Sequence, residues 1–216
     1  MLKVLIMGSS LVEGLEIFDK AKVHRLKCGR YVQLIYRGFS GYSFNNFNTP
    51  QGIALTNDLL QCHPDFVLTI MGANSISTLV TVGEVTAEAS QFFYRLRNIF
   101  RTINPQGQII ASQLPLRFVR DPRNRHHTPL PKAFKRFRDR VNTKLCSLKP
   151  IDHILAIGGP GRLDDERFFK KDKVHLRPRG LDFQLQLIKN KLFRILNPDA
   201  KAPEEPLVSP YNWDVE

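Results

Sequence analysis

The sequence predicts an α/β domain in which helices cover both faces of a parallel sheet. Five short apolar runs, rich in Val, Ile and Leu, recur along the chain and do not alternate strictly with polar residues. Strands that are buried on both faces have this pattern. Helical patterns separate the runs, and polar residues of chemical interest directly follow them, at the strand ends where open α/β sheets bind ligands.

The five apolar runs are the expected strands. They are Lys3–Met7, Tyr31–Tyr36, Phe66–Met71, Gln108–Gln113 and His153–Ile157. Parallel strands need crossover connections, and the helical patterns between the runs would supply them. We therefore expect a three-layer α/β/α, flavodoxin-like fold whose five-stranded parallel sheet has the strand order 2-1-3-4-5.

The helices are expected where apolar residues recur at helical spacing. The clearest pattern ends where Asn104-Pro105 stops it. Another follows the last motif of the chain and places Leu181, Leu185 and Ile188 on one face. The predicted helices span residues 53–60, 84–102, 133–148 and 181–195.

One domain should account for most of the chain. Its 216 residues, 42% hydrophobic and 24% charged, have the composition of a globular protein of one-domain size. Repeated prolines after Asn197 predict a domain at residues 1–196 and an extended tail at 197–216. No apolar run approaches the roughly 20 residues of a membrane helix. The three scattered cysteines indicate neither a disulfide framework nor zinc, so we expect an intracellular, cytoplasmic protein.

Five residues that follow the predicted strands have the chemistry of a serine esterase. Ser10 would be the nucleophile, His175 the base that takes its proton, and Asp172 the group that orients the imidazole. The backbone amides of Ser10 and Gly41 and the side chain of Asn74 would hold the oxyanion.

Each of these residues also has a structural interpretation. Ser10 could cap the following helix, Gly41 could serve a turn with positive φ, and Asn74 could belong to an ordinary loop. Asp172 and His175 could form a solvated surface pair. The sequence alone does not separate these interpretations, but the shared position of all five after strands favours a site.

Two nearby acids and the other histidines offer alternatives to these assignments. Asp164 and Asp165 are alternative partners for the base. The remaining histidines have no cysteines or carboxylates at metal-ligand spacing, so neither a metal site nor a cofactor is expected.

Together these segments resemble the SGNH, or GDSL-type, hydrolase superfamily. Its four blocks are similar, in order, to Gly8-Ser9-Ser10-Leu11, Ser40-Gly41, Gly72-Ala73-Asn74 and Asp172-Lys173-Val174-His175. The resemblance implies an esterase acting on a small ester or lipid. Departures from the family pattern are Ser9 for an aspartate, Tyr42 for an acid and Met71 for a glycine. Segments 113–115 and 175–180 look closer to SGNH-like domains of animal genomes, some of them retrotransposon-encoded, which implies a nucleic-acid context.

The formal net charge of +12 favours an anionic partner, and much of it lies between Arg117 and Lys149. This stretch could be the solvated face of an amphipathic helix or a surface that binds nucleic acid or an anionic membrane. The candidate contacts are Lys135, Arg136, Arg138 and Arg140. The second candidate function is therefore a catalytically weak or inactive SGNH-fold module that binds polyanions.

Overall fold

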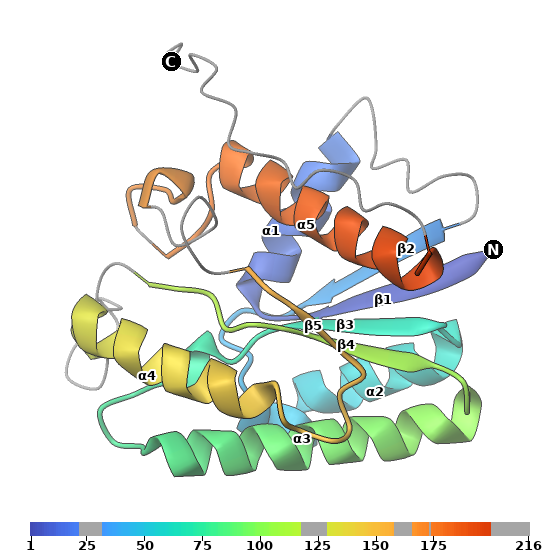
Figure 1. The fold of residues 1–216 in the computed structure, drawn as a ribbon, viewed down its shortest axis with the longest axis horizontal. Helices are drawn as coiled ribbons and strands as arrows, with labels where there is room; N and C mark the ends of the chain where they lie inside the picture. Colours follow the sequence, from blue (N-terminus) through green and yellow to red (C-terminus); the bar gives the residue numbers. More distant parts are fainter. Residues whose placement is uncertain (22–31, 118–128, 158–165, 173, 200–216) are drawn as a thin grey trace.

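The sheet has five parallel strands in the order β2-β1-β3-β4-β5, as the sequence predicts. The computed structural model describes residues 1–21, 32–117, 129–157, 166–172 and 174–199. The strands are β1 (Leu2–Gly8), β2 (Val32–Gly38), β3 (Phe66–Ile70), β4 (Gln108–Ser112) and β5 (His153–Leu155). Each expected strand overlaps an observed one (Figure 1).

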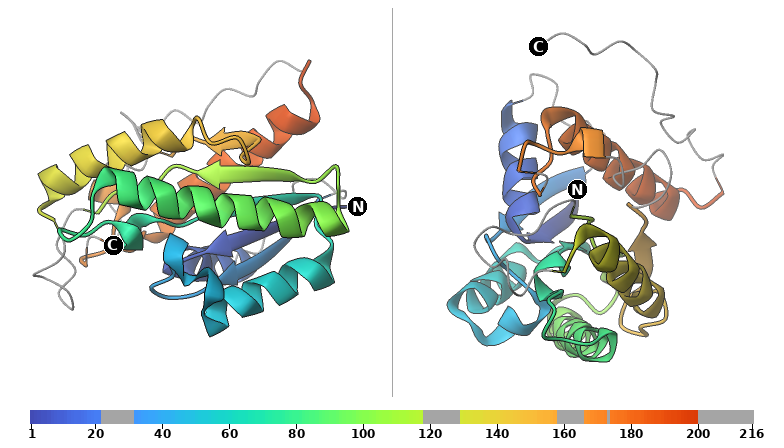
Figure 2. Two further views of the ribbon diagram at one scale, coloured as in Figure 1. Left: turned by 90° about the horizontal axis from the view of Figure 1, so that it is seen from below. Right: turned by 90° about the vertical axis from the view of Figure 1, so that its left-hand side faces the viewer.

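Helices cover both faces of this sheet (Figures 1 and 2). On one face lie α1 (Ser10–Ala21) and α5 (Pro178–Leu196); on the other lie α2 (Pro50–Cys62), α3 (Val82–Ile103) and α4 (Pro131–Leu145). All four helices predicted from apolar spacing are present. Helix α4 ends three residues before the predicted end, at 148, because the chain tightens into turns there: Ser147 N–H bonds Lys144 O and Leu148 N–H bonds Leu145 O.

Helix α1 was not among the helices predicted from apolar spacing. Two residues weaken its pattern: Gly14 has low helix propensity, and Ile17 is an apolar residue on the exposed face. Gly14 lies where α1 and α5 pack together, because a Cβ at this position would be 3.6 Å from a Leu181 methyl group. Close packing between α1 and α5 thus explains why a glycine occupies position 14, although glycine does not favour a helix.

The apolar runs do not alternate because both faces of the sheet are buried. Val4 and Ile6 of β1 pack in the cluster formed with α1 and α5. Leu5 and Met7 of the same strand pack in the cluster formed with α2, α3 and α4. Each strand residue therefore meets a helix layer on one side or the other.

The carboxyl ends of the central strands lie at one level. Gly8 of β1 pairs with Gly38 of β2 and with Ile70 of β3. A Cβ at Gly8 would lie 2.1 Å from the Ile70 carbonyl oxygen, so only glycine permits this close approach of two strand ends. The loops that follow β1, β2 and β3 consequently start side by side, at the edge that the right panel of Figure 2 faces.

Beyond α5 the structure describes only Asn197–Asp199, so most of the predicted tail lies outside the described residues. Asp164 and Asp165 lie outside them as well. None of the helices in the described ranges is long and apolar enough to cross a membrane.

Candidate active site

Ser10 is the first residue of α1, and only Ser9 separates it from the end of β1. The turn between them is fixed by two backbone hydrogen bonds, from Ser9 N–H to Ile70 O (3.2 Å) and from Val12 N–H to Ser9 O (2.9 Å). The half-buried Ser10 side chain thus lies at the N-terminus of a helix, where the helix dipole stabilises negative charge.

Ser10, His175 and Asp172 form a continuous chain of polar contacts, although Ser10 lies 165 residues before His175. Ser10 Oγ is 3.3 Å from His175 Nε2, and His175 Nδ1 is 2.8 Å from Asp172 Oδ2. The first distance is long for a hydrogen bond to a hydroxyl, as is common in catalytic pairs without substrate. The three residues have the order and the contacts of a Ser-His-Asp triad.

A short hairpin places His175 opposite Ser10. Phe169 and Leu176 form an antiparallel bridge, and both side chains are buried in the cluster beneath α1 and α5. Lys170 N–H donates to His175 O at 2.7 Å. Since successive residues of extended chain point to opposite faces, burial of Leu176 directs His175 away from the core and toward the edge of the sheet.

Asp172 is held by the same turn. Its Oδ1 accepts the backbone N–H groups of Val174 and His175, each at 2.9 Å. Asp172 is exposed, and the limited desolvation of its carboxylate acts to raise its pKa, but the hydrogen bonds from these N–H groups and from the imidazole outweigh this effect, so the pKa is lowered. An ionised carboxylate can only accept a hydrogen bond, so His175 Nδ1 donates to Asp172 and Nε2 is the ring nitrogen that faces Ser10.

The loops after β2 and β3 bring Gly41 and Asn74 to the same edge. Gly41 has φ of +77°, in the left-handed region that glycine favours. Asn74 lies in the short helix η2 (Ala73–Ser75), and its Nδ2 donates to the Tyr42 carbonyl at 3.0 Å. A second bond, from Phe44 N–H to Ser75 Oγ at 3.1 Å, joins the same loops. The expectation that the Gly41 amide and the Asn74 side chain converge on Ser10 stays a prediction.

Arg117 contacts Asn74, one of the predicted oxyanion residues, and was not among the site residues predicted from the sequence. Its guanidinium donates a hydrogen bond to Asn74 Oδ1. One signal was present in the sequence: Arg117 follows β4 by a short interval, much as Asn74 follows β3. Arg117 also begins a basic stretch, however, and this pattern is typical of surface charges.

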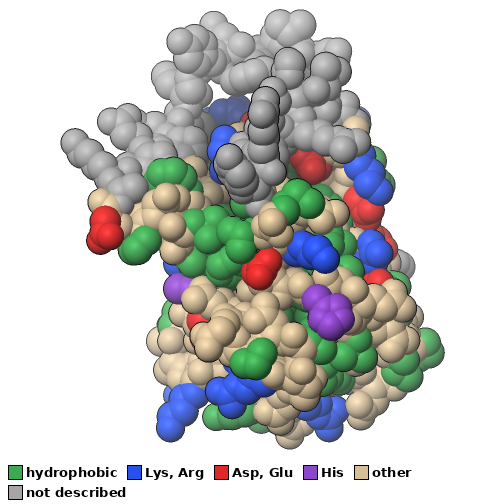
Figure 3. Space-filling model, turned by 90° about the vertical axis from the view of Figure 1, so that its right-hand side faces the viewer, with side chains coloured by type: hydrophobic (Ala, Val, Ile, Leu, Met, Phe, Trp, Pro, Cys, Tyr) green, Lys and Arg blue, Asp and Glu red, His purple; other side chains and the backbone are tan. Residues whose placement is uncertain are grey.

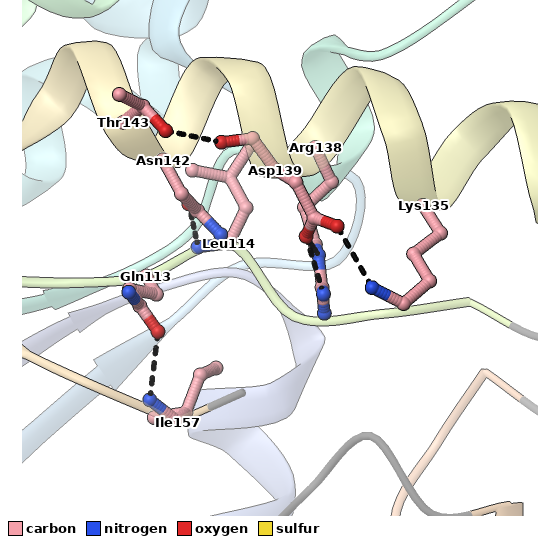
Figure 4. A network of polar contacts seen from close by, with 8 residues as sticks. All are labelled: Gln113, Leu114, Lys135, Arg138, Asp139, Asn142, Thr143 and Ile157. Carbon is pink, nitrogen blue, oxygen red and sulfur yellow. Dashed lines mark hydrogen bonds and ion pairs between the residues drawn. The ribbon is translucent and has the colours of Figure 1, made fainter. Parts of the chain in front are cut away.

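The candidate polyanion contacts on α4 are not all at the surface. Lys135, Arg136 and Arg140 are exposed, whereas Arg138 is buried and pairs with Asp139 at 2.6 Å (Figure 4). Position 138 shares the inward face of α4 with Phe134, one helical turn away. The expectation that Arg138 belongs to a basic surface is therefore wrong, because its helical position places it in the protein interior.

Solved structures with a similar fold include esterases and acylhydrolases. A carbohydrate esterase family 3 protein from Talaromyces cellulolyticus is 14% identical, with a TM-score of 0.63 over 93% of this chain and 100% of the other. A GDSL-like lipase from Bacteroides thetaiotaomicron is 17% identical, with a TM-score of 0.61 over 89% and 88%. A carbohydrate acetylesterase from Sinorhizobium meliloti is 14% identical, with a TM-score of 0.65 over 90% and 100%.

No protein-family model and no curated protein matches the sequence. The resemblance to SGNH hydrolases is thus confirmed as a likeness of fold. The nucleic-acid context suggested by segments 113–115 and 175–180 stays a prediction. In the part of the chain that the structure describes, no three His, Cys, Asp or Glu side chains are grouped so that they could hold a metal ion.

Proposed function

We propose that this protein is a serine esterase that hydrolyses a carboxylic ester through an acyl-enzyme. The observation that supports this best is the chain of contacts from Ser10 through His175 to Asp172 at the carboxyl edge of the sheet. The likeness to solved structures of esterases and acylhydrolases supports it independently. The proposed substrates are short acyl esters.

In the first half of the reaction, Ser10 Oγ attacks the ester carbonyl carbon while its proton passes to His175 Nε2. The Asp172 carboxylate stabilises the imidazolium that forms. The carbonyl oxygen, now negative, would accept hydrogen bonds from the Ser10 and Gly41 amides and from Asn74 Nδ2. When the carbon–oxygen bond to the alcohol breaks, His175 returns the proton to the leaving alkoxide and the acyl group stays on Ser10.

Water completes the cycle by the same groups. His175 Nε2 takes a proton from the water as its oxygen attacks the acyl carbon, and the same oxyanion donors act again. The bond to Ser10 Oγ then breaks, and the proton on His175 passes to this oxygen. The products are a carboxylic acid and the restored triad.

Fluorophosphonate labelling combined with hydrolysis of p-nitrophenyl acetate tests the proposal. Ser10→Ala should abolish labelling and nearly all turnover. Asn74→Ala should lower kcat by roughly 10²–10³, the usual loss of one oxyanion donor. Ser147→Ala, which removes an exposed hydroxyl on the turn after α4, is the matched control and should label normally. Full labelling and turnover by Ser10→Ala would show that the nucleophile is another residue.

A second function, compatible with the first, is binding of polyanions through α4. It is favoured by the exposed side chains of Lys135, Arg136 and Arg140, which lie close together on α4. If Ser10 proves unreactive, this surface becomes the better candidate for the role of the protein.

A further inference from the structure

Arg117 lies on the segment that follows β4, beside the predicted oxyanion hole. Its Nη2 donates to Oδ1 of Asn74, although the two residues are 43 positions apart. The side chain is only partly exposed. Arg117 therefore differs from the exposed cations of α4, with which the sequence groups it, because it contacts a residue of the site.

The backbone that leads to Arg117 is held in place by α4 and by the core. Leu114 N–H donates to Oδ1 of the buried Asn142 on α4 at 2.8 Å (Figure 4). Ile157 N–H donates to the Gln113 side chain at 3.3 Å. Leu114 and Leu116 are both buried. The residues directly before Arg117 are thus held in place by hydrogen bonds and by burial.

The same segment packs directly against the loop that carries Asn74. Gly72 begins this loop with φ of +100°. A Cβ at Gly72 would lie 3.0 Å from Leu114 Cγ and 2.6 Å from the Phe44 ring. Glycine is needed here both for its backbone conformation and for this close contact. The absence of a side chain at 72 lets the segment with Arg117 approach Asn74.

Both the oxygen and the nitrogen of the Asn74 side-chain amide have hydrogen-bond partners. Its oxygen accepts from the Arg117 guanidinium, and its nitrogen donates to the Tyr42 carbonyl. A flipped amide would place N–H against a donor that cannot accept and oxygen against a carbonyl that cannot donate. The nitrogen carries two hydrogens, so the bond to Tyr42 leaves one for an oxyanion. A cationic donor on the amide oxygen also polarises the amide, which makes its N–H a stronger donor.

We propose that Arg117 is a positioning residue of the active site. It holds the Asn74 amide with its nitrogen toward the oxyanion and strengthens that N–H as a donor. The proposal rests on the esterase function proposed above and deepens it. Because Arg117 acts through Asn74, its effect should appear in kcat and should depend on Asn74 being present.

A double-mutant cycle with p-nitrophenyl acetate tests this dependence. Arg117→Met should lower kcat roughly 10–100-fold and leave KM within about twofold, since an oriented donor acts mainly in the transition state. Arg117→Lys, which keeps the charge and loses the planar guanidinium, should recover part of the loss. In an Asn74→Ala background, Arg117→Met should have no further effect beyond about twofold.

Arg101→Met is the matched control, because it removes the same charge by the same substitution from the exposed surface of α3. It should leave kcat unchanged. The proposal is wrong if Arg117→Met leaves kcat unchanged, or if it lowers kcat equally with and without Asn74. Thermal melting of each variant separates loss of positioning from loss of fold, and Arg117→Lys replaces Arg117→Met if the latter does not fold.

Nuclear magnetic resonance gives a readout that does not need turnover. The side-chain amide signals of Asn74 can be identified by their loss in Asn74→Ala. In Arg117→Met these signals should shift and their hydrogens should exchange faster with solvent than in the wild type. Unchanged signals would show that Arg117 does not hold the amide. Absence of fluorophosphonate labelling at Ser10 would instead reject the esterase function. The NMR signals of Asn74 would then still show whether Arg117 holds the Asn74 amide.

Discussion

At the scale of single residues, the two carboxylate oxygens of Asp172 have different partners. Oδ1 accepts two backbone N–H groups of the turn, and Oδ2 contacts the imidazole of His175. In Asp172→Asn the amide oxygen can still accept the backbone N–H groups of Val174 and His175. Its nitrogen would then donate to His175 Nδ1 and force the wrong imidazole tautomer. We expect kcat to fall by roughly 10²–10⁴ with little change in melting temperature.

The comparison variant is Asp172→Ala, which removes both contacts. It should lower kcat as well and should also lower the melting temperature, because the turn loses its two backbone bonds. Steady-state kinetics and melting curves for both variants distinguish the two tasks. If Asp172→Asn kept more than a tenth of the wild-type kcat, orientation of His175 by Asp172 would be unimportant.

Two buried tyrosines differ in their hydrogen bonds, so we expect loss of the hydroxyl to change the free energy of unfolding differently at each. Tyr36 Oη donates to Asp19 at 3.1 Å, whereas Tyr42 Oη has no hydrogen-bond partner among the described residues. Burial raises the pKa of Tyr42 to about 12. Tyr36→Phe should reduce the free energy of unfolding by about 1–3 kcal/mol, since a buried carboxylate loses a donor. Tyr42→Phe should be neutral or stabilising by about 1 kcal/mol.

Urea denaturation of the two variants measures this difference directly. A Tyr42→Phe variant that lost as much stability as Tyr36→Phe would mean that a buried water bonds the Tyr42 hydroxyl. The sequence indicates neither outcome, because the bond from Tyr36 to Asp19 and the burial of the Tyr42 hydroxyl both depend on the fold.

At the scale of elements, α3 begins with a capping box. Thr81 Oγ1 accepts from Glu84 N–H at 3.2 Å, and the Glu84 carboxylate accepts from Thr81 N–H at 2.7 Å. Thr81→Ala should destabilise the protein by about 1 kcal/mol, as the loss of an N-cap does. Hydrogen bonds from the Thr81 backbone and then its hydroxyl hold the pKa of Glu84 below its ordinary value of 4.5.

The lowered pKa fixes the direction of a pH effect. Because the carboxylate is favoured in the folded state, its stabilising contribution is present above pH 4.5 and is lost as pH falls through the lower folded-state pKa. The neutral Glu84→Gln variant keeps the capping geometry and should lack this part of the acid destabilisation. Chemical denaturation of both proteins between pH 6 and pH 3 measures it. Parallel stability curves for the two would contradict the prediction.

Except for α1, the apolar pattern of the sequence predicted where the α-helices and strands lie, but not the residues at which they begin and end. The 84–102 pattern lies wholly inside α3, and every expected strand overlaps an observed one. Helix α2 begins at Pro50, three residues before the predicted start at Ile53, because Thr49 caps it and proline fits its first turn. Caps of this kind depend on individual polar contacts, which the apolar period does not contain.

At the scale of the whole molecule, the predicted catalytic and oxyanion residues follow four of the five strands, and Arg117 follows the other, β4. The order of the strands and the rule that ligands bind at their carboxyl ends predicted Ser10, Gly41, Asn74 and His175 at one edge. Contacts that depend on side-chain packing were not predictable. The bond from Arg117 to Asn74 and the burial of Arg138 both require the path of the chain around α4.

The net charge of +12 is not spread evenly over the molecule. On the opposite edge, near the amino ends of the strands, acidic and basic side chains are interspersed on the part that Figure 3 shows. Helix α4 instead has exposed cations at Lys132, Lys135, Arg136, Arg140 and Lys144, with Asp139 as its one acid. Any attraction for a polyanion should therefore concentrate on α4.

Replacing Lys135, Arg136 and Arg140 by serine tests this surface. Arg138 is kept, because its burial excludes it from direct contact with a ligand. If each replaced residue meets a phosphate of duplex DNA, the slope of log K against log salt should become shallower by about 2–3. The control removes the same number of charges from three other helices, at Lys20, Arg101 and Arg194, all exposed. It should leave the slope unchanged.

Filter binding of a short duplex at low and moderate salt, run beside the p-nitrophenyl acetate assay, gives both readouts. Hydrolysis of a small neutral ester should be unchanged in either triple variant, since such a substrate does not need a basic platform. Equal loss of binding in the two triple variants would indicate an effect of net charge alone. Absence of wild-type binding at low salt would leave α4 with a solvated basic face, and sedimentation with anionic vesicles would then be the remaining test of this surface.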